Sequence, residues 1–172
     1  GAPLAAVGGP GIVPRGAAQR AGVVALTALV YPHYCRVKAM DLGGYGGIYR
    51  DGRRAAMIGE RLGDDSHREM SAICTHPDFH GLGYAGHLTT WLTNDTLSRG
   101  RQPSLHVSYE NPRALGLYER HGYRVRRDIG FWSLPRIDPG QRAPASRSIR
   151  RLPPKRRRYW AGHKPTFRRH SR

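Results

Sequence analysis

The stretch that decides the fold is His80-Gly81-Leu82-Gly83-Tyr84-Ala85-Gly86 (HGLGYAG). Apolar residues recur after it at helical spacing, so we expect the glycines to lie at the start of a helix. Glycines let a ligand approach the backbone closely, and the N–H groups at a helix N-terminus bind anions. The stretch therefore predicts a site for a phosphorylated ligand.

The segments that precede this stretch predict strands in close succession. Gly46–Arg50 and Arg54–Leu62 flank Asp51-Gly52, a dipeptide typical of a tight hairpin turn. A third strand is expected at Glu69–Thr75, and the connections leave no room for the crossover helices of βαβ units. These three strands therefore form an antiparallel meander, preceded by a helix that includes Val23–Val30.

The segments that follow complete a mixed pattern. The helix that the glycines open is expected to end at Arg99-Gly100, and Ser104–Tyr109 predicts another strand. A second helix is expected from an N-cap at Asn111 to Gly122, followed by a strand or hairpin over Tyr123–Leu134. The order α, β-β-β, α, β, α, β predicts an α/β (α+β) fold with a mixed, mostly antiparallel sheet.

Composition divides the 172 residues into three parts. Residues 1–22 are rich in Gly, Ala and Pro and are expected to be a flexible lead-in, whereas 23–134 form the folded domain. Residues 135–172 hold 13 Lys/Arg and one acidic residue, which is +12 of the formal net charge of +17. Because this tail has no apolar period, we expect it to be disordered, and the folded part is only mildly basic.

Few features bear on cellular location. The two cysteines, Cys35 and Cys74, form no paired framework, which is typical of a reducing compartment. The apolar run Val23–Val30 is far shorter than the roughly 20 residues that cross a bilayer. No signal-peptide pattern is seen at the N-terminus. A cytoplasmic protein without a membrane partner is expected.

A dinucleotide site is the first alternative for the glycines. Gly81, Gly83 and Gly86 satisfy the G-x-G-x-x-G pattern. In such a site, however, the first strand of a parallel βαβ unit runs directly into the glycines. Here the loop Thr75–His80 intervenes after an antiparallel meander, so a nicotinamide cofactor is disfavoured.

A second motif lies about 30 residues further on, at Asn111–Tyr123 (NPRALGLYERHGY). It resembles the N-x-x-A-x-x-L-Y-E-x-x-G-F/Y block of the GNAT superfamily of N-acetyltransferases. The glycine stretch is similar to that family's Arg/Gln-x-x-Gly-x-Gly/Ala signature. The resemblance covers about Ala25–Leu134 and is closest to the branch related to glycine N-acyltransferases. It implies a GNAT-like sheet with helices packed on both faces.

The resemblance also implies acetyl-CoA as the donor and direct transfer of its acetyl group to an amine in a ternary complex. The strand before the loop would pair with the pantetheine arm, and the glycine stretch would hold the pyrophosphate. Tyr118 would be the general acid that protonates the departing thiolate, a role for which a phenol with a pKa near 10 is suited. The implied cofactor-binding residues are Ile73, Cys74, Thr75, His80, Gly81, Leu82, Gly83, Tyr84, Ala85, Gly86 and Asn111.

His80 is the departure from the family pattern, which has Arg or Gln there. A neutral imidazole offers one donor where a guanidinium offers five. The substitution leaves open an acyl-CoA-binding protein of this fold with little activity.

Three residues are candidates for the general base that deprotonates the amine: Glu69, then His106, then Glu60. Glu69 opens the central strand, Glu60 lies on its neighbour, and His106 lies where some family members carry a base. For each of the three, the alternative is a residue without a catalytic role, either exposed on its strand or hydrogen-bonded to neighbouring groups.

Two further constellations are weaker. Cys74, His76, His80 and His87 lack the paired spacing of a structural zinc site, so no metal is expected. The run Lys155–Arg158 beside Tyr159 and Trp160 could bind nucleic acid, although a solvated tail is the preferred interpretation. Nucleic acid is therefore a partner only through the tail.

Overall fold

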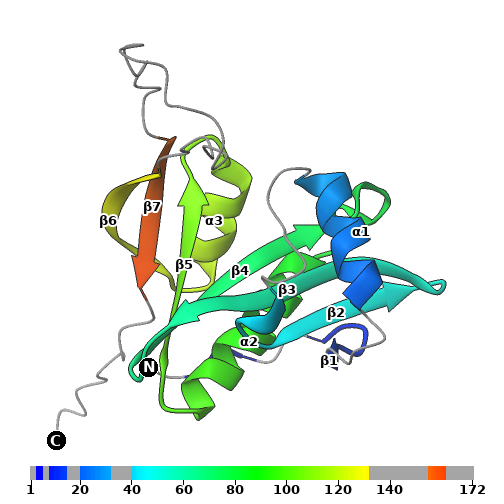
Figure 1. Cartoon of the computed structure of the whole chain (residues 1–172), viewed down its shortest axis with the longest axis horizontal. Helices are drawn as coiled ribbons and strands as arrows, with labels where there is room; N and C mark the ends of the chain where they lie inside the picture. Colours follow the sequence, from blue (N-terminus) through cyan, green and yellow to red (C-terminus); the bar gives the residue numbers. More distant parts are fainter. Residues whose placement is uncertain (1–2, 6–7, 15–19, 32–39, 132–154, 162–172) are drawn as a thin grey trace, which may run out of the picture.

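Seven strands form one sheet in the order β1-β2-β3-β4-β5-β7-β6 (Figure 1). The computed structural model describes residues 3–5, 8–14, 20–31, 40–131 and 155–161. The strands are β1 (Val13–Pro14), β2 (Tyr45–Arg50), β3 (Arg53–Gly63), β4 (His67–Thr75), β5 (Gln102–Ser108), β6 (Arg124–Phe131) and β7 (Lys155–Ala161). The helices are α1 (Arg20–Val30), α2 (Tyr84–Ser98) and α3 (Pro112–Arg120), with a short 3-10 helix η3 (Pro77–Phe79).

The strands pair as the sequence predicts for the meander. β2, β3 and β4 are antiparallel, and β4 and β5 form the single parallel pair in the described sheet. The predicted turn is present, with positive φ at Asp51 and Gly52 (51° and 71°). Positive φ at both central residues matches the right-handed twist of the flanking strands, which explains the Asp-Gly pair.

The pairing of β4 with β5 is short. It runs from His67–Met70 against Gln102–Leu105 and then stops. On the other edge of β4 the register with β3 shifts, since Met57 faces Cys74 while Gly59 faces Ser71. The extra β4 residue makes a bulge at Ala72, whose φ is 53°. Because a bulge bends its strand, the end of β4 turns away from β5 and a gap opens between them.

Helices cover both faces of the sheet, which confirms the predicted fold class (Figure 1). α1 packs with Met57 and Cys74 on one face. Ile58, the next residue of β3, packs with α2 and α3 on the other face, as alternation along a strand requires. Within the described residues, no helix is long and apolar enough to span a membrane.

The last seven described residues correct one expectation. Lys155–Ala161, assigned to a disordered tail, forms strand β7 between β5 and β6. The reason is that a strand requires backbone hydrogen bonds, which the edges of β5 and β6 supply, and does not require an apolar period of its own. The rest of the predicted tail, 135–154 and 162–172, lies outside the described residues.

The lead-in also differs from expectation in two places. Leu4 donates its N–H to Asn94 Oδ1 (2.7 Å) and accepts from Asn94 Nδ2 (2.9 Å). Val13–Pro14 pairs with Gly46–Gly47 as β1. The lead-in is rich in Gly, Ala and Pro, but Leu4 and Val13–Pro14 are held by hydrogen bonds to Asn94 and to β2. Composition alone does not reveal such contacts. The other predicted helices and strands are present, and their first residues differ from the prediction by three positions or fewer.

Candidate functional site

Two clefts meet where β4 and β5 diverge. The first, which we call the α1-side cleft, measures about 230 Å³. It is lined by α1, by the facing parts of β3, β4 and β5, and by the start of α3. Its lining residues are Thr27, Tyr31, Tyr45, Arg61, Glu69, Met70, Ser71, Ala72, Ile73, Cys74, Leu105, His106, Val107, Ser108, Asn111, Ala114 and Tyr118.

The second, the α2-side cleft, measures about 420 Å³ and lies between the end of β4, the start of α2 and α3. Its lining residues are Val30, Tyr31, Ile73, Cys74, Thr75, Phe79, His80, Gly81, Gly83, Tyr84, Ala85, Gly86, Asn111, Arg113, Ala114, Leu117, Tyr118 and Arg120. The residues shared by both clefts are Tyr31, Ile73, Cys74, Asn111, Ala114 and Tyr118. The gap in the sheet thus joins the two clefts at Tyr118.

The glycine stretch forms the floor of the α2-side cleft, as its motif predicts. Gly81 and Gly83 have φ of 83° and 75°, a region that side chains with a Cβ disfavour. Gly83 is the N-cap of α2 and supplies no side-chain bond, so the N–H groups of the first turn keep no intrahelical partner. A Cβ at either glycine would meet nothing within 4 Å. The backbone therefore offers open donors to an anion.

The structure brings together nearly all the predicted cofactor-binding residues at this cleft. Leu82 is the exception: its side chain is 58% exposed, and it lines neither cleft.

His80 is held by the loop itself. Its Nε2–H donates to the carbonyl oxygen of Thr75, the last residue of β4 (3.1 Å). With Nε2 occupied in this way, the neutral ring has its second nitrogen as an acceptor and no further N–H for a phosphate. The side chain braces the loop against β4, and the anion-binding capacity rests on backbone groups and on other side chains.

Tyr118 lies at the junction of the clefts and is 6% exposed. Its ring packs edge-on against Tyr123 (centroids 6.1 Å apart), whose hydroxyl is within 2.6 Å of the Thr93 hydroxyl. Burial, with smaller contributions from Tyr31 and Tyr123, raises the pKa of Tyr118 well above that of a free phenol. The hydroxyl therefore keeps its proton at neutral pH.

Asn111 caps α3 and also lines both clefts. Its Oδ1 accepts a hydrogen bond from the backbone N–H of Ala114 (3.0 Å), which confirms the predicted N-cap of α3. Because Oδ1 is used for the cap, the Nδ2 group is the part of the amide that can donate to a ligand in either cleft.

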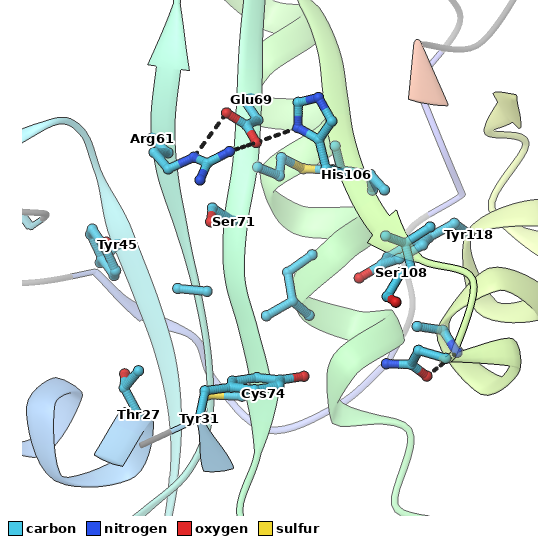
Figure 2. A pocket seen from close by; sticks show the side chains of 17 residues that line it. Thr27, Tyr31, Tyr45, Arg61, Glu69, Ser71, Cys74, His106, Ser108 and Tyr118 are labelled. Carbon is cyan, nitrogen blue, oxygen red and sulfur yellow. Dashed lines mark hydrogen bonds and ion pairs between the residues drawn. The ribbon is translucent and has the colours of Figure 1, made fainter. Parts of the chain in front are cut away.

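Arg61, Glu69 and His106 form a charged group in the α1-side cleft, and Figure 2 shows the Glu69 carboxylate between the other two side chains. Arg61 donates through Nε (3.0 Å) and NH2 (2.5 Å), and His106 donates through Nδ1 (2.6 Å). Burial raises the pKa of the carboxyl group of Glu69, but the bonds from His106 and Arg61 and the Arg61 charge outweigh it, so the pKa is lowered. Glu69 is thus an ionised group that orients His106 and leaves Nε2 as the basic ring nitrogen.

Glu60 lies apart from the other two base candidates. It faces Met70 in the β3–β4 register, on the face that α2 covers, and it lines neither cleft. Arg99 NH2 (2.5 Å) and the N–H of Gly44 (2.9 Å) bind its carboxylate, whose side chain is 4% exposed. Alternation along β3 explains the placement, because Arg61 takes the position toward the α1-side cleft.

Three features of the site were not predicted from the sequence. Arg61 reaches Glu69 across a strand pair whose register depends on the bulge at Ala72. Tyr31, just after α1, extends into the α1-side cleft opposite Tyr118 (Figure 2). Arg113 and Arg120 of α3 line the α2-side cleft, and their spacing of seven residues is the sequence signal that places them on one face of the helix.

The histidines near the glycine stretch do not converge. His76 Nδ1 accepts from the N–H of Asp78, whereas His80 binds Thr75. In the part of the chain that the structure describes, no three His, Cys, Asp or Glu side chains lie close enough together to hold a metal ion.

Comparisons with known proteins agree with this geometry. A family model described as FR47-like protein matches residues 45–132. The chain is similar to a protein of Novosphingobium aromaticivorans described as a GNAT-family acetyltransferase, with 27% identity and a TM-score of 0.68 over 95% of this chain. The chain spans 61% of that protein's length.

Two more distant structures share the fold. One is the ribosomal-protein-S18-alanine N-acetyltransferase of Escherichia coli (16% identity, TM-score 0.68, 88% of this chain and 92% of that one). The other is a GNAT family acetyltransferase of Elizabethkingia anophelis with acetyl-CoA bound (13% identity, TM-score 0.69, 90% and 97%). Among proteins with curated functions, no sequence matches the chain.

Proposed function

The chain belongs to the FR47-like family, whose model matches more than half of it, and on that basis we propose that it transfers an acetyl group from acetyl-CoA to a primary amine. The observation that carries the proposal is the position of Tyr118. This protonated hydroxyl lies where a cleft suited to a phosphorylated cofactor meets a cleft that contains a carboxylate–imidazole pair.

Acetyl-CoA fits the α2-side cleft on three grounds. The first turn of α2 offers backbone donors to the pyrophosphate. Among the described residues the pairing of β4 with β5 ends at Met70, so the β5-side edge of β4 beyond it faces the α2-side cleft, where the amides of the pantetheine arm would lie. Ile73, Cys74 and Tyr118 at the junction then surround the thioester.

The proposed reaction is direct attack in a ternary complex. The neutral amine attacks the thioester carbonyl, a C–N bond forms, and the carbonyl oxygen becomes an oxyanion that a backbone N–H of β4 near Cys74 stabilises. As the C–S bond breaks, Tyr118 gives its proton to the thiolate sulfur. The burial that raises the pKa of Tyr118 would also raise the pKa of a thiol formed beside it, which favours proton transfer from the phenol to the sulfur.

We assign the general base to His106 held by Glu69. Nδ1–H is bound to the carboxylate, so Nε2 takes the proton that the amine loses, directly or through a water molecule. Glu69 itself is a weaker base than an ordinary glutamate, because its pKa is lowered. It therefore acts by fixing the tautomer of His106 and by stabilising the imidazolium.

The charge of the α1-side cleft bears on the acceptor. Glu69 is the one carboxylate among the described residues that line it, and Arg61 neutralises that charge. A polycationic acceptor would find no unpaired negative charge there. We therefore propose an acceptor with a single amino group, either otherwise uncharged or bearing a carboxylate.

Two finer assignments belong to the same proposal. Membership in the branch related to glycine N-acyltransferases is supported by the block Asn111–Tyr123, and a cytoplasmic location by the cysteine content. An acyl-CoA-binding protein without turnover and a nucleic-acid-binding protein are less favoured, because three solved structures similar to this chain are named as acetyltransferases.

The test is calorimetric titration of the full chain with acetyl-CoA, with NADH as the control ligand. We expect micromolar binding of acetyl-CoA and none of NADH. A thiol-release assay then compares single amines, amino acids and polyamines as acceptors. Binding without release for any amine would favour the binding protein, and absence of acetyl-CoA binding would refute the proposal.

A further inference from the structure

α3 presents two arginines to the α2-side cleft. Arg113, in the first turn, and Arg120, the last residue of the helix, both line that cleft and are exposed. Leu117, between them at a spacing of i+4, also lines it. Residues at i, i+4 and i+7 share one face of a helix. The two guanidinium groups therefore belong to the same wall.

The path of the Arg120 side chain brings it toward Arg113. Its NH1 lies 3.2 Å from the position that a Cβ would take at Gly116, one turn earlier. Side chains in a helix point toward its N-terminus, and the missing side chain at Gly116 leaves room for the guanidinium to lie along the helix. Arg120 thus extends toward the first turn of α3, where Arg113 begins.

This wall faces the glycine stretch across a narrow distance. A Cβ placed at Gly86, in the first turn of α2, would lie 3.5 Å from Leu117 Cδ1 and 3.3 Å from His121 Cε1. The two helices are therefore in near contact at Gly86. A phosphate held by the first turn of α2 lies within reach of long side chains on α3.

The charges in the cleft are of one sign. None of the described residues that line it is acidic, whereas Arg113 and Arg120 are cationic. His80 donates its Nε2–H to Thr75, so that donor is not offered to a phosphate. Backbone N–H groups carry only partial charges, so a ligand with several phosphates needs further cations.

We propose that Arg113 and Arg120 form an anion subsite on α3 that binds the phosphates at the nucleotide end of coenzyme A. This inference rests on the proposed function and extends it. The subsite supplies side-chain donors to the phosphates in place of the His80 Nε2–H, which is bonded to Thr75. It also gives the protein a preference for acyl groups carried on coenzyme A over those carried on an unphosphorylated pantetheine.

The experiment compares three donors in calorimetric titrations of the full chain: acetyl-CoA, acetyl-dephospho-CoA and S-acetylpantetheine. The variants are Arg113→Gln, Arg120→Gln and the double variant, and Arg124→Gln is the matched control. Arg124 is exposed on β6 and lines neither cleft. Thermal unfolding of each variant checks that the fold is kept.

We expect each single variant to weaken acetyl-CoA binding about 10-fold, since a charge-assisted contact to phosphate is about twice as strong as a neutral one. The double variant should weaken it more, with a smaller dependence on salt concentration. Binding of S-acetylpantetheine should be the same in all variants. The two dephosphorylated donors then separate contacts to the 3′-phosphate from contacts to the diphosphate.

Two results would overturn the subsite. One is acetyl-CoA affinity in both single variants equal to that of the wild type, and the other is an equal loss in Arg124→Gln, which would mean a general charge effect. Failure of the wild-type chain to bind acetyl-CoA is a different outcome, because it contradicts the proposed function as well.

Discussion

The two clefts are built in opposite ways. The floor of the α2-side cleft comes from consecutive residues, Gly81–Gly86, and its chemistry is that of backbone N–H groups. The α1-side cleft takes Arg61, Glu69 and His106 from three strands, and its chemistry is that of side chains. Local sequence therefore determines the first cleft, whereas the second depends on the register of the sheet.

This difference explains what a substitution can do in each. A backbone donor survives the exchange of a side chain, so His80 can replace the usual arginine without removing the floor of the cleft. A side-chain group such as Glu69 with its two donors fails when one member changes, because a buried charge without its partners is costly. Tyr118 is one of the six described residues that line both clefts.

The largest effect on kcat is expected at Tyr118. Tyr118→Phe removes the proton donor and keeps the ring, so kcat should fall by about 10²- to 10⁴-fold, the usual contribution of a general acid. Acetyl-CoA affinity should change little, since the phosphate contacts are elsewhere. Steady-state kinetics and calorimetry on the same preparation measure both quantities.

Tyr123→Phe is the matched control. Tyr123 is also buried, its pKa is also raised by burial, and it lines neither cleft. The change removes the contact with Thr93 and should lower stability without lowering kcat. An equal loss of kcat in both variants would assign Tyr118 a packing role.

The second effect, on acetyl-CoA affinity, tests whether the backbone N–H groups of the α2-side cleft bind the ligand. Gly83→Val places a branched side chain at a φ of 75° in the open cleft and displaces the first N–H groups of α2. A hydrogen bond to a charged group contributes about 1.5–3 kcal/mol, so we expect acetyl-CoA affinity to fall about 10- to 100-fold. Calorimetric titration measures the loss.

Gly100→Val provides the control for strain. Gly100 follows α2, has a φ of 73°, and a Cβ there would also meet nothing within 4 Å. Both variants should lose similar stability in thermal unfolding, because both force a branched residue into the left-handed region. Only Gly83→Val should lose affinity, and loss in both would mean that the backbone of the cleft is not the binding element.

The same contrast between local sequence and sheet register decides which features can be predicted from the sequence. Asp51-Gly52, the Asn111 cap and the glycine stretch are local signals, and each is found where it was predicted. The bulge at Ala72 has no such signal, since a residue with a Cβ at φ of 53° is uncommon and the sequence there resembles any strand. Because the bulge opens the gap between β4 and β5, the junction at Tyr118 could be placed only from the structure.

Strand β7 is a second feature that the local sequence does not predict. Its residues have no apolar alternation, and the strand exists because β5 and β6 leave a space with hydrogen-bonding edges on both sides. The candidate bases follow the same rule: Glu60 and Glu69 look alike in sequence and lie on opposite faces of the sheet. Their separation gives the next two tests.

The third effect concerns Glu69. Glu69→Gln keeps the shape and removes the charge that orients His106 and neutralises Arg61, so kcat should fall about 10-fold, at the lower end for groups that assist a general base. The KM for acetyl-CoA should stay constant. Because the pKa of Glu69 is lowered, the carboxylate is ionised throughout the neutral range, and its contribution disappears only as the pH falls through that lowered pKa, below the usual range of a glutamate.

Asp65→Asn is the control for the loss of a carboxylate, since Asp65 is exposed in the β3–β4 turn. It should keep the kcat and the pH profile of the wild type. A wild-type kcat in Glu69→Gln, measured from pH 6 to 9, would remove Glu69 from the proposed mechanism and leave His106 without an orienting group.

The smallest effect on the reaction is expected on the opposite face. Glu60→Gln removes the charge bound by Arg99 and Gly44, outside both clefts, and should leave kcat unchanged while lowering the free energy of unfolding by about 1 kcal/mol at pH 7. Burial raises the pKa of Glu60, but the bonds from Arg99 and Gly44 and the charges of Arg99 and Arg68 outweigh it, so its pKa in the folded chain is lowered. Such a group stabilises the fold above its unfolded pKa of about 4.3 and loses that contribution as the pH falls through the folded value. Urea denaturation of wild type and variant from pH 3 to 8 should therefore show two curves that converge at the acid end. A difference in stability that does not shrink as the pH falls, or any loss of kcat, would mean that Glu60 acts through something other than this ion pair.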